Sequence, residues 1–390
     1  MNLPQNINRK EENYGQESLY TFKKTCQEEI QKITKEILRT MESQQDKETP
    51  VNIIQRIRKA DITTIVKAVI LFTSMNLSYR QLAVEMAAHS ACVMSAVAWR
   101  KRMLQIGPYF HEAVNRLYLE KEPDHTEEPS ELKHMAIDAT VIPVEGKTGT
   151  NTKVHVLYDI NKQRISDVKV SDGKQAESLE NFRKIPPNAL CIADRAYGRA
   201  RQIDYITKQK AQYLVRVTPS NINFYYDADC TEKVDFQSIL TDDPISVPCY
   251  CRYRRDKKYC VCSTRVIAVK IPDDKLRSID RRVIRTAQKK QRKLQPLTVF
   301  FNHYLILATS LQDSPEDLAT LYRQRWQIEI LFKRSKGAFG FHSIRHSNAA
   351  YQSLRTQLWA AVSILASALS SAVHTISAYL FFHLFPFLFA

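Results

Sequence analysis

The first twenty residues of the chain lack an apolar run, so we expect no secretory signal peptide at this end. Acidic residues are also scarce relative to basic ones. The 41 Asp and Glu stand against 57 Lys and Arg, which gives a net charge of +16. A basic excess of this size favours a polyanionic partner, DNA or RNA first. Without a signal peptide we expect a cytoplasmic protein whose eight cysteines are free thiols.

Formal charge is missing from the whole stretch after Arg355. An apolar stretch of this length is long enough to cross a bilayer. Ser, Thr and His interrupt it, however, so a buried core helix followed by an apolar tail is the preferred interpretation. We therefore expect no membrane association. With 44% hydrophobic and 25% charged residues over 390 positions, the chain is typical of a soluble globular protein of two or three domains.

Helical patterns fill the region from residue 51 to about residue 120. Ser78 and Gln81 have the spacing of a capping box, and a third segment, Ser95–Met103, carries the cations Arg100, Lys101 and Arg102. A basic end on such a helix pair resembles a helix-turn-helix, although the usual turn glycine is missing. A small helical bundle fits the same pattern equally well.

The apolar period changes at about residue 131. Strands are expected over residues 135–142, 154–160, 164–170, 189–193 and 213–217, with helices over 176–184 and 199–208. This order predicts an α/β fold with a mixed sheet. Asp138 lies inside the first strand and Asp194 directly follows the fourth.

Residues 221–303 are predicted to form a β-rich, basic insertion. Nine basic residues and one acid lie between Lys275 and Lys293, a local charge of +8 that favours contact with a polyanion. We expect Arg281, Arg282 and Arg285 to contact DNA.

Two Cys-x-Cys pairs in this insertion predict a hairpin that turns at Arg255 and Asp256. Cys251 would then face Cys260, Cys249 would face Cys262, and all four would share one face. Four thiolates can hold structural zinc. Because the usual zinc spacing is C-x2-C, burial is the preferred interpretation.

A strong helix start at Ser314-Pro315-Glu316-Asp317 leads into a helix through Leu321–Lys336. At about 100° per residue, one face packs on a core and the other gathers a single acid, cations and aromatics. That mixture is typical of a phosphate-handling site. Its members are Tyr322, Arg325, Trp326, Glu329, Lys333 and Lys336.

Three carboxylates distant in sequence are then available for one site. Asp138, Asp194 and Glu329 are suited to hold a pair of divalent ions about 4 Å apart, the arrangement used to cut and join phosphodiesters. A buried acid in an apolar strand costs several kcal/mol unless it is paired or metal-bound. Asp159, Asp172 and Asp204 compete, and sequence does not exclude Asp159 from the site.

These residues resemble a known family. Tyr322-x2-Arg325-x3-Glu329-x6-Lys336 matches the YREK signature of a large family of bacterial insertion-sequence DDE transposases, and the segments that begin at Asp138 and Asp194 resemble its two Asp motifs. The resemblance covers roughly residues 60–360. It implies a ribonuclease-H-like catalytic core of a mixed sheet flanked by helices, a β-rich insertion and an N-terminal helical domain.

The resemblance also implies what the protein does. Asp138, Asp194 and Glu329 would hold Mg²⁺, with Mn²⁺ able to substitute, and no small-molecule cofactor is expected. Tyr322, Arg325 and Lys336 would hold phosphates of double-stranded transposon ends, with Trp326 as a contributor to base flipping. The N-terminal domain would bind terminal inverted repeats, and a homodimer would synapse two ends and join them to target DNA. Such a protein would associate with the nucleoid.

Two alternatives remain open at this point. One is a catalytically inactive DNA-binding regulator derived from such an enzyme, and the other is a ribonuclease-H-like nuclease without strand transfer. The expected division of the chain is 1–50 (charged segment), 51–128 (helical DNA-binding domain), 129–220 and 304–365 (catalytic core), 221–303 (basic insertion) and 366–390 (apolar tail).

Overall fold

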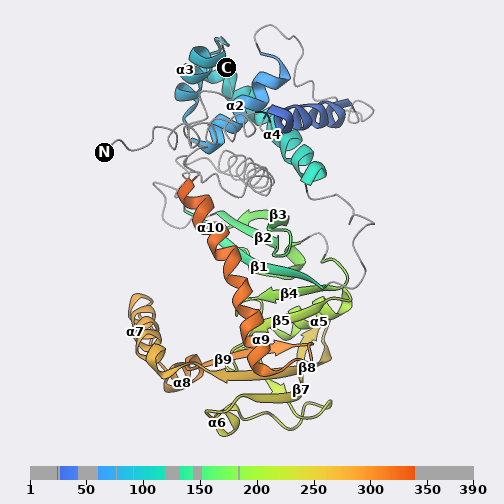
Figure 1. The fold of residues 1–390 in the computed structure, drawn as a ribbon, viewed down its shortest axis with the longest axis vertical. Helices are drawn as coiled ribbons and strands as arrows, with labels where there is room; N and C mark the ends of the chain where they lie inside the picture. Colours follow the sequence, from blue (N-terminus) through green and yellow to red (C-terminus); the bar gives the residue numbers. More distant parts are fainter. Residues whose placement is uncertain are drawn as a thin grey trace, which may run out of the picture.

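The structure, a computed structural model, describes residues 24, 27–42, 60–75, 77–90, 92–118, 132–143, 152–182 and 185–338 (Figure 1). The predicted apolar tail, 366–390, and the end of the core, 339–365, lie outside these residues. No helix in the described part of the chain is long and apolar enough to cross a membrane.

Helices form the first part of the fold. Residues 27–42 are helical, followed by α2 (Ile62–Ser74), α3 (Tyr79–Ser90) and α4 (Ala96–Tyr118). The capping box before α3 is confirmed, since Ser78 Oγ accepts from Gln81 N at 3.2 Å and Gln81 Oε1 accepts from Ser78 N at 2.8 Å. The expected helix at Ser95–Met103 is much longer than predicted. These helices gather above the sheet in the view of Figure 1.

One nine-stranded mixed sheet forms the second part, with the order β3-β2-β1-β4-β5-β9-β8-β7-β6. The first three strands, β1 (Lys133–Ile142), β2 (Thr152–Asp159) and β3 (Arg164–Asp172), are antiparallel neighbours. On the other side of β1 lies β4 (Ala189–Ala193), parallel to it, and β5 (Gln212–Arg216) pairs with β4 in the same direction. All five expected strands of the core are present.

The insertion contributes strands to the same sheet. It contains β6 (Phe224–Tyr225), α6 (Phe236–Ile239), β7 (Ile245–Arg255), β8 (Lys258–Lys270), α7 (Asp273–Lys289) and α8 (Pro296–Asn302). After it, β9 (Tyr304–Thr309) pairs with β5 on one side and β8 on the other. The insertion is therefore β-rich, and it extends the core sheet. Figure 1 shows α7 projecting from the sheet.

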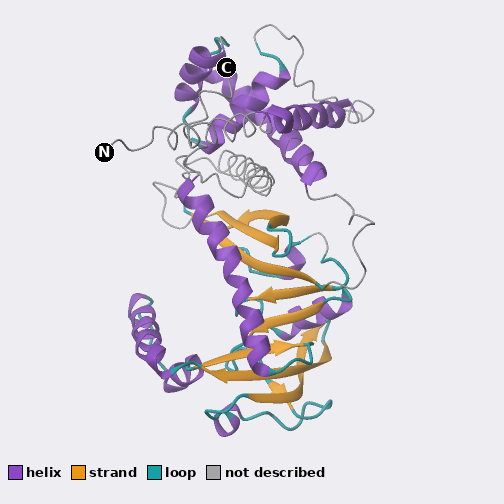
Figure 2. Ribbon diagram, in the orientation of Figure 1, coloured by secondary structure: helices purple, strands orange, loops and turns teal. Residues whose placement is uncertain are grey.

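Helices cover both faces of this sheet (Figure 2). On one face run α9 (Pro315–Tyr322), a 3-10 turn (Arg323–Arg325) and α10 (Trp326–Ala338). On the other lie α5 (Ala200–Lys208) and a 3-10 turn (Leu179–Asn181). Alternate strand residues fill two separate cores, because successive side chains point to opposite faces. This arrangement confirms the predicted ribonuclease-H-like mixed sheet flanked by helices.

Two expected helices differ from the structure. The segment expected as a helix over 176–184 forms only the 3-10 turn at Leu179–Asn181, within its described part, ahead of Pro186 and Pro187. The long helix expected through Leu321–Lys336 is interrupted by the 3-10 turn at Arg323–Arg325. Three residues at about 120° instead of 100° rotate α10 by roughly 60° relative to the predicted wheel.

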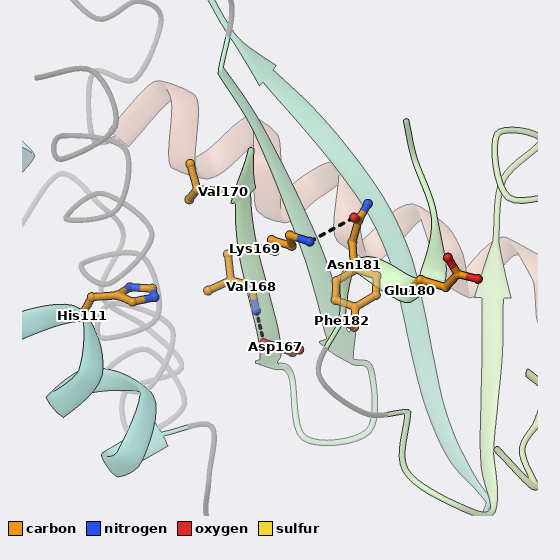
Figure 3. A pocket seen from close by; sticks show the side chains of 8 residues that line it. All are labelled: His111, Asp167, Val168, Lys169, Val170, Glu180, Asn181 and Phe182. Atoms are coloured by element: carbon orange, nitrogen blue, oxygen red, sulfur yellow. Dashed lines mark hydrogen bonds between the residues drawn. The ribbon is translucent and has the colours of Figure 1, made fainter. Parts of the chain in front are cut away.

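A cavity of about 400 Å³ lies between α4 and β3. His111 of α4 lines one side, and β3 residues and Glu180, Asn181 and Phe182 line the other (Figure 3). Within it, Lys169 Nζ donates to Asn181 Oδ1 at 3.3 Å. This contact belongs to a polar network that also reaches the site described next.

Candidate active site

Strand register brings Asp138 and Asp194 side by side. In the parallel pair β1–β4, Ile137 lies opposite Ala193; Asp138 is the next residue of β1, and Asp194 directly follows the end of β4. Asp138 Oδ1 accepts from Ala139 N at 2.8 Å, and Asp194 Oδ1 accepts from Ala196 N at 2.8 Å. The backbone thus fixes both carboxylates at neighbouring positions of the sheet.

A third acid joins them, and it is Glu177. One carboxylate oxygen from each of Asp138, Glu177 and Asp194 lies within 4.8 Å of the others. Glu177 Oε1 accepts from Lys153 Nζ of β2 at 3.2 Å. We did not predict this residue, which lies in the segment between β3 and the 3-10 turn at Leu179–Asn181, where no strand or motif marks it.

The pKa of the Asp138 carboxyl is raised to about 7. Burial is the largest cause, and the negative charges of Asp194 and Glu177 add to it. The hydrogen bond from Ala139 N and the charge of Arg325 act in the opposite direction and are outweighed. Burial beside two other acids therefore favours the protonated form of Asp138 more than an exposed position would.

Arg325 connects this cluster to Glu329. Its Nη1 donates to Asp138 Oδ2 at 3.2 Å, and its Nη2 donates to Glu329 Oε1. The guanidinium also lies over the ring of buried Tyr322, 5.9 Å from the centroid. Glu329 is thus linked to Asp138 through Arg325, and it is not a member of the three-carboxylate group found among the described residues.

The remaining predicted residues of this helix lie further along it. The Trp326 side chain is 63% exposed, and Lys333 is exposed. Lys336 is partly buried, and burial lowers its pKa. Of the predicted residues, Arg325 donates to Asp138, and the Tyr322 ring lies against the Arg325 guanidinium. On α7, the side chains of Arg281, Arg282 and Arg285 are all exposed.

A second residue absent from the prediction is Arg216, at the end of β5. Burial lowers its pKa, and the positive charges of Arg195, Arg282 and Arg325 lower it further. Among the described residues no carboxylate forms an ion pair with it. Its only sequence signal is a charge at the end of the otherwise apolar run Tyr213–Val215.

Gly198 allows the loop after Asp194 to approach β5 at this point. A Cβ at Gly198 would lie 2.4 Å from the carbonyl oxygen of Arg216, which is backbone and cannot move aside. The close approach sets the backbone of Arg216 against the loop that follows Asp194.

The competing acids have other partners. Asp159 Oδ1 accepts from Lys162 N at 2.9 Å in the turn after β2. Asp204 pairs with Lys208 on α5 and accepts from the Tyr253 hydroxyl. The side chain of Asp172 lies outside the described residues. Asp159 and Asp204 therefore make contacts within the fold, and among the described residues they are not members of the acid cluster.

The cysteine hairpin is present, with a register that differs from the prediction. The turn consists of Asp256 and Lys257, which have φ of 49° and 64°, so Arg255 pairs with Lys258. Cys251 consequently faces Cys262, with the sulfurs 3.2 Å apart, so the expected Cys251–Cys260 and Cys249–Cys262 pairings are both wrong. In the described part of the chain, no three cysteine sulfurs come close enough together to share a metal ion.

The acid cluster has the chemistry of a divalent-cation site. All its donors are carboxylate oxygens, the ligands that Mg²⁺ and Mn²⁺ prefer. The hydroxyl of fully buried Tyr197 has no hydrogen-bond partner among the described residues, and Glu177, Asp138 and Asp194 all raise its pKa after burial. A buried hydroxyl without a partner calls for an explanation, and a bound ion with its waters supplies one.

Comparisons with known proteins agree with this geometry. Residues 129–365 match the family model described as "Transposase DDE domain". The chain is 24% identical over 303 residues to a protein assigned as transposase InsL for insertion sequence element IS186A of Escherichia coli strain K12, covering 73% of this chain and 78% of that one.

Two further relatives cover less of the chain. The transposase for insertion sequence element IS421 of Escherichia coli is 26% identical over 226 residues, covering 54% of this chain and 58% of the relative. The transposase for IS231E of Bacillus thuringiensis subsp. finitimus is 24% identical over 239 residues, covering 54% and 48%. With the matched model spanning both aspartates, Glu177 and Glu329, the chain belongs to the family of bacterial insertion-sequence transposases with a DDE domain.

Proposed function

We propose that this transposase binds the terminal inverted repeats of its own element, cuts the DNA at those ends and joins them to a target. The observation that carries the proposal is the position of Asp138 and Asp194 on adjacent parallel strands, with Arg325 joining Asp138 to Glu329. Asp138, Asp194 and Glu329 are proposed as the catalytic acids.

The chemistry requires a divalent cation, Mg²⁺ with Mn²⁺ as a substitute. Bound ions of this kind activate an oxygen nucleophile and stabilise the leaving oxygen of a phosphodiester. The chain's own residues hold and orient the DNA. Tyr322, Arg325 and Lys336 are proposed to bind phosphates at the cut end, and Lys333 and exposed Trp326 to contact the adjoining nucleotides.

More distant contacts are proposed for two other parts of the chain. Arg281, Arg282 and Arg285 on α7 are exposed cations that suit the flanking duplex. The helices α2–α4 are proposed to bind the terminal repeat, in a helix-turn-helix or another helical arrangement. A homodimer is proposed to bring two ends together, and such a protein would associate with the nucleoid.

A direct test uses purified full-length protein, Mg²⁺ and a DNA fragment that carries the element's own ends. The proposal expects nicked ends and joined products. Asp194→Ala should abolish cleavage while end binding in a mobility-shift assay persists. Binding without nicking by the unaltered protein would instead identify a regulator, and nicking without joined products a nuclease. Cleavage unaffected by Asp194→Ala would remove Asp194 from the mechanism.

A further inference from the structure

We propose that Glu177, with Asp138 and Asp194, binds a divalent cation in the DNA-free protein, and that this first cation does not depend on Glu329. The inference rests on the proposed function, since it concerns the same site. It assigns the third ligand to a residue outside the sequence signature of the family.

The arrangement of oxygens supports Glu177 in this role. Its carboxylate lies within 4.8 Å of those of both aspartates, and among the described residues these three form the single group of acids suited to a metal ion. Glu329 Oε1 instead accepts from Arg325. Three carboxylates at this spacing repel one another unless a cation lies between them.

Hydrogen bonds hold the backbone of Ala176, the residue before Glu177. Asn181 Nδ2 donates to the carbonyl oxygen of Ala176 at 3.0 Å. The same Nδ2 lies 3.4 Å from His155 Nδ1, and Lys169 donates to Asn181 Oδ1 (Figure 3). The residue next to Glu177 is therefore tied to β2 and β3.

The backbone that follows Glu177 is fixed as well. Gln202 Oε1 on α5 accepts from Leu179 N at 2.6 Å, and Gln202 Nε2 donates to Ser178 Oγ at 3.1 Å. Restraint on both sides holds the carboxylate toward the aspartates. A surface acid would not need such support, whereas a metal ligand does, because its geometry must be preset.

Tyr197 supplies a second observation at this site, since its N–H donates to the carbonyl oxygen of Asp194 at 3.2 Å. The Tyr197 side chain is fully buried, and its hydroxyl has no hydrogen-bond partner in the described part of the chain. A cation held by these acids would carry waters. One such water would satisfy the hydroxyl.

A simpler explanation is that Glu177 only pairs with Lys153. The two explanations differ in what Lys153 does. If Glu177 is a structural partner, removing either residue lowers stability and leaves metal binding unchanged. If Glu177 is a ligand, Lys153 competes with the metal for it, so removing Lys153 maintains or strengthens metal binding.

The experiment measures Mn²⁺ binding to the DNA-free full-length protein by electron paramagnetic resonance. We expect Glu177→Gln to weaken Mn²⁺ binding at least ~10-fold, since even groups that only support a ligand contribute that much. Asp194→Asn should weaken it similarly. Lys153→Gln and Glu329→Gln should bind at least as tightly as the unaltered chain. The matched control is Glu180→Gln, an acid three residues away that pairs with Arg201.

Thermal unfolding supplies the second readout. Mn²⁺ should raise the unfolding temperature of the unaltered protein, because it binds the folded state. Glu177→Gln should lose this increase while keeping end binding. If Glu177→Gln does not fold, Glu177→Asp, which keeps the charge and withdraws it by one methylene, should still weaken Mn²⁺ binding.

The inference is overturned if Glu177→Gln, or Glu177→Asp in its place, binds Mn²⁺ like the unaltered protein. It is also overturned if Glu329→Gln loses Mn²⁺ binding as Asp194→Asn does. Unaltered protein that neither binds Mn²⁺ nor cuts its ends would instead remove the proposed function. Protein that binds Mn²⁺ and cuts, with Glu177→Gln unimpaired, would remove Glu177 alone.

Discussion

Arg325 Nη1 donates to Asp138 Oδ2 at 3.2 Å, although the two residues are 187 positions apart in the chain. The same guanidinium holds Glu329 four residues further along the helix. Its Nε is buried without a partner among the described residues. Arg325 therefore neutralises part of the acid cluster in the DNA-free protein, and it competes with a divalent cation for Asp138.

Replacing Arg325 should have opposite effects on metal and DNA. Arg325→Gln removes the competing cation, so Mn²⁺ should bind the DNA-free protein more tightly. End cleavage should fall at least ~10-fold, because a charge-assisted hydrogen bond of the kind proposed to a phosphate contributes roughly 1.5–3 kcal/mol. Titration with Mn²⁺ and a gel-based cleavage assay would measure the two effects.

The control for this change is Arg323→Gln, which removes an exposed cation two residues away. It should alter neither quantity appreciably. Weaker Mn²⁺ binding in Arg325→Gln would contradict the competition and indicate that Arg325 mainly holds the acids in place.

Sequence identified Asp138 and Asp194 because an acid inside or directly after an apolar strand is costly without a partner. The pairing of parallel strands then brings the two together, as Ile137 opposite Ala193 shows. The i, i+4 spacing of Arg325 and Glu329 likewise placed them on one helical face. Local patterns sufficed for these residues because their neighbours along one strand or helix decide their positions.

Glu177 and Arg216 could not be predicted in this way. Glu177 lies in a segment that is held by hydrogen bonds from Asn181, in the 3-10 turn, and to Gln202, on α5. Neither contact leaves a periodic pattern in the sequence. Arg216 lies against the loop after Asp194 because Gly198 allows this loop to approach β5, and no local pattern predicts that approach. The sequence did not predict the 3-10 turn at Arg323–Arg325 either, because its residues are compatible with an α-helix.

Arg216 is expected to strengthen DNA binding without adding to the stability of the fold. A partly buried guanidinium without a paired carboxylate costs free energy, so Arg216→Gln should leave the unfolding temperature unchanged or higher. Binding of cut element ends should weaken at least several-fold, because Arg216→Gln removes one cation that would pair with a phosphate. Calorimetry and a mobility-shift titration would measure these two quantities.

For comparison, Arg254→Gln removes an exposed cation near the tip of the β7–β8 hairpin. It should leave both quantities close to those of the unaltered protein. A marked loss of stability in Arg216→Gln would show that Arg216 stabilises the folded protein, which contradicts the proposed phosphate contact.

The three arginines of α7 should act through charge alone. Changing Arg281, Arg282 and Arg285 together to Gln should weaken binding to element ends and to unrelated DNA alike. The slope of log K against log salt should become shallower by up to ~3, about one for each phosphate that an arginine no longer neutralises. Because these side chains are exposed, the unfolding temperature should stay the same. An unchanged salt slope would exclude α7 from the DNA interface.

The cysteine hairpin should fold without zinc. Cys249 and Cys251 are buried, and burial raises the pKa of the Cys249 thiol to about 12, which disfavours the thiolate that zinc requires. We expect native mass spectrometry of protein prepared with added Zn²⁺ to show no stoichiometric ion at this hairpin. A chelator should leave the unfolding temperature unchanged in the presence of reductant. One tightly held zinc ion that disappears on changing Cys251 and Cys262 to Ser would contradict this.

His155 should make the stability of the core depend on pH. Burial lowers its pKa from 6.5 to about 4, and the charges of Lys153 and Lys169 contribute to the shift. The folded state thus favours the neutral ring, which accepts from Asn181 at Nδ1 and donates to Ser171 at Nε2. Its contribution to stability is fully present above pH 6.5 and is lost as pH falls from about 6.5 to about 4.

The variant His155→Gln retains an uncharged polar group and removes the titration. Its unfolding temperature should lie below that of the unaltered protein at pH 7.5, and the difference should shrink or reverse near pH 4.5. The control is His89→Gln, at an exposed position of α3, measured over the same pH range. A difference between His155→Gln and the unaltered protein that stays constant across this range would mean that His155 does not titrate on unfolding. The network that positions Glu177 would then tolerate a charged ring, because Asn181 would have found another acceptor.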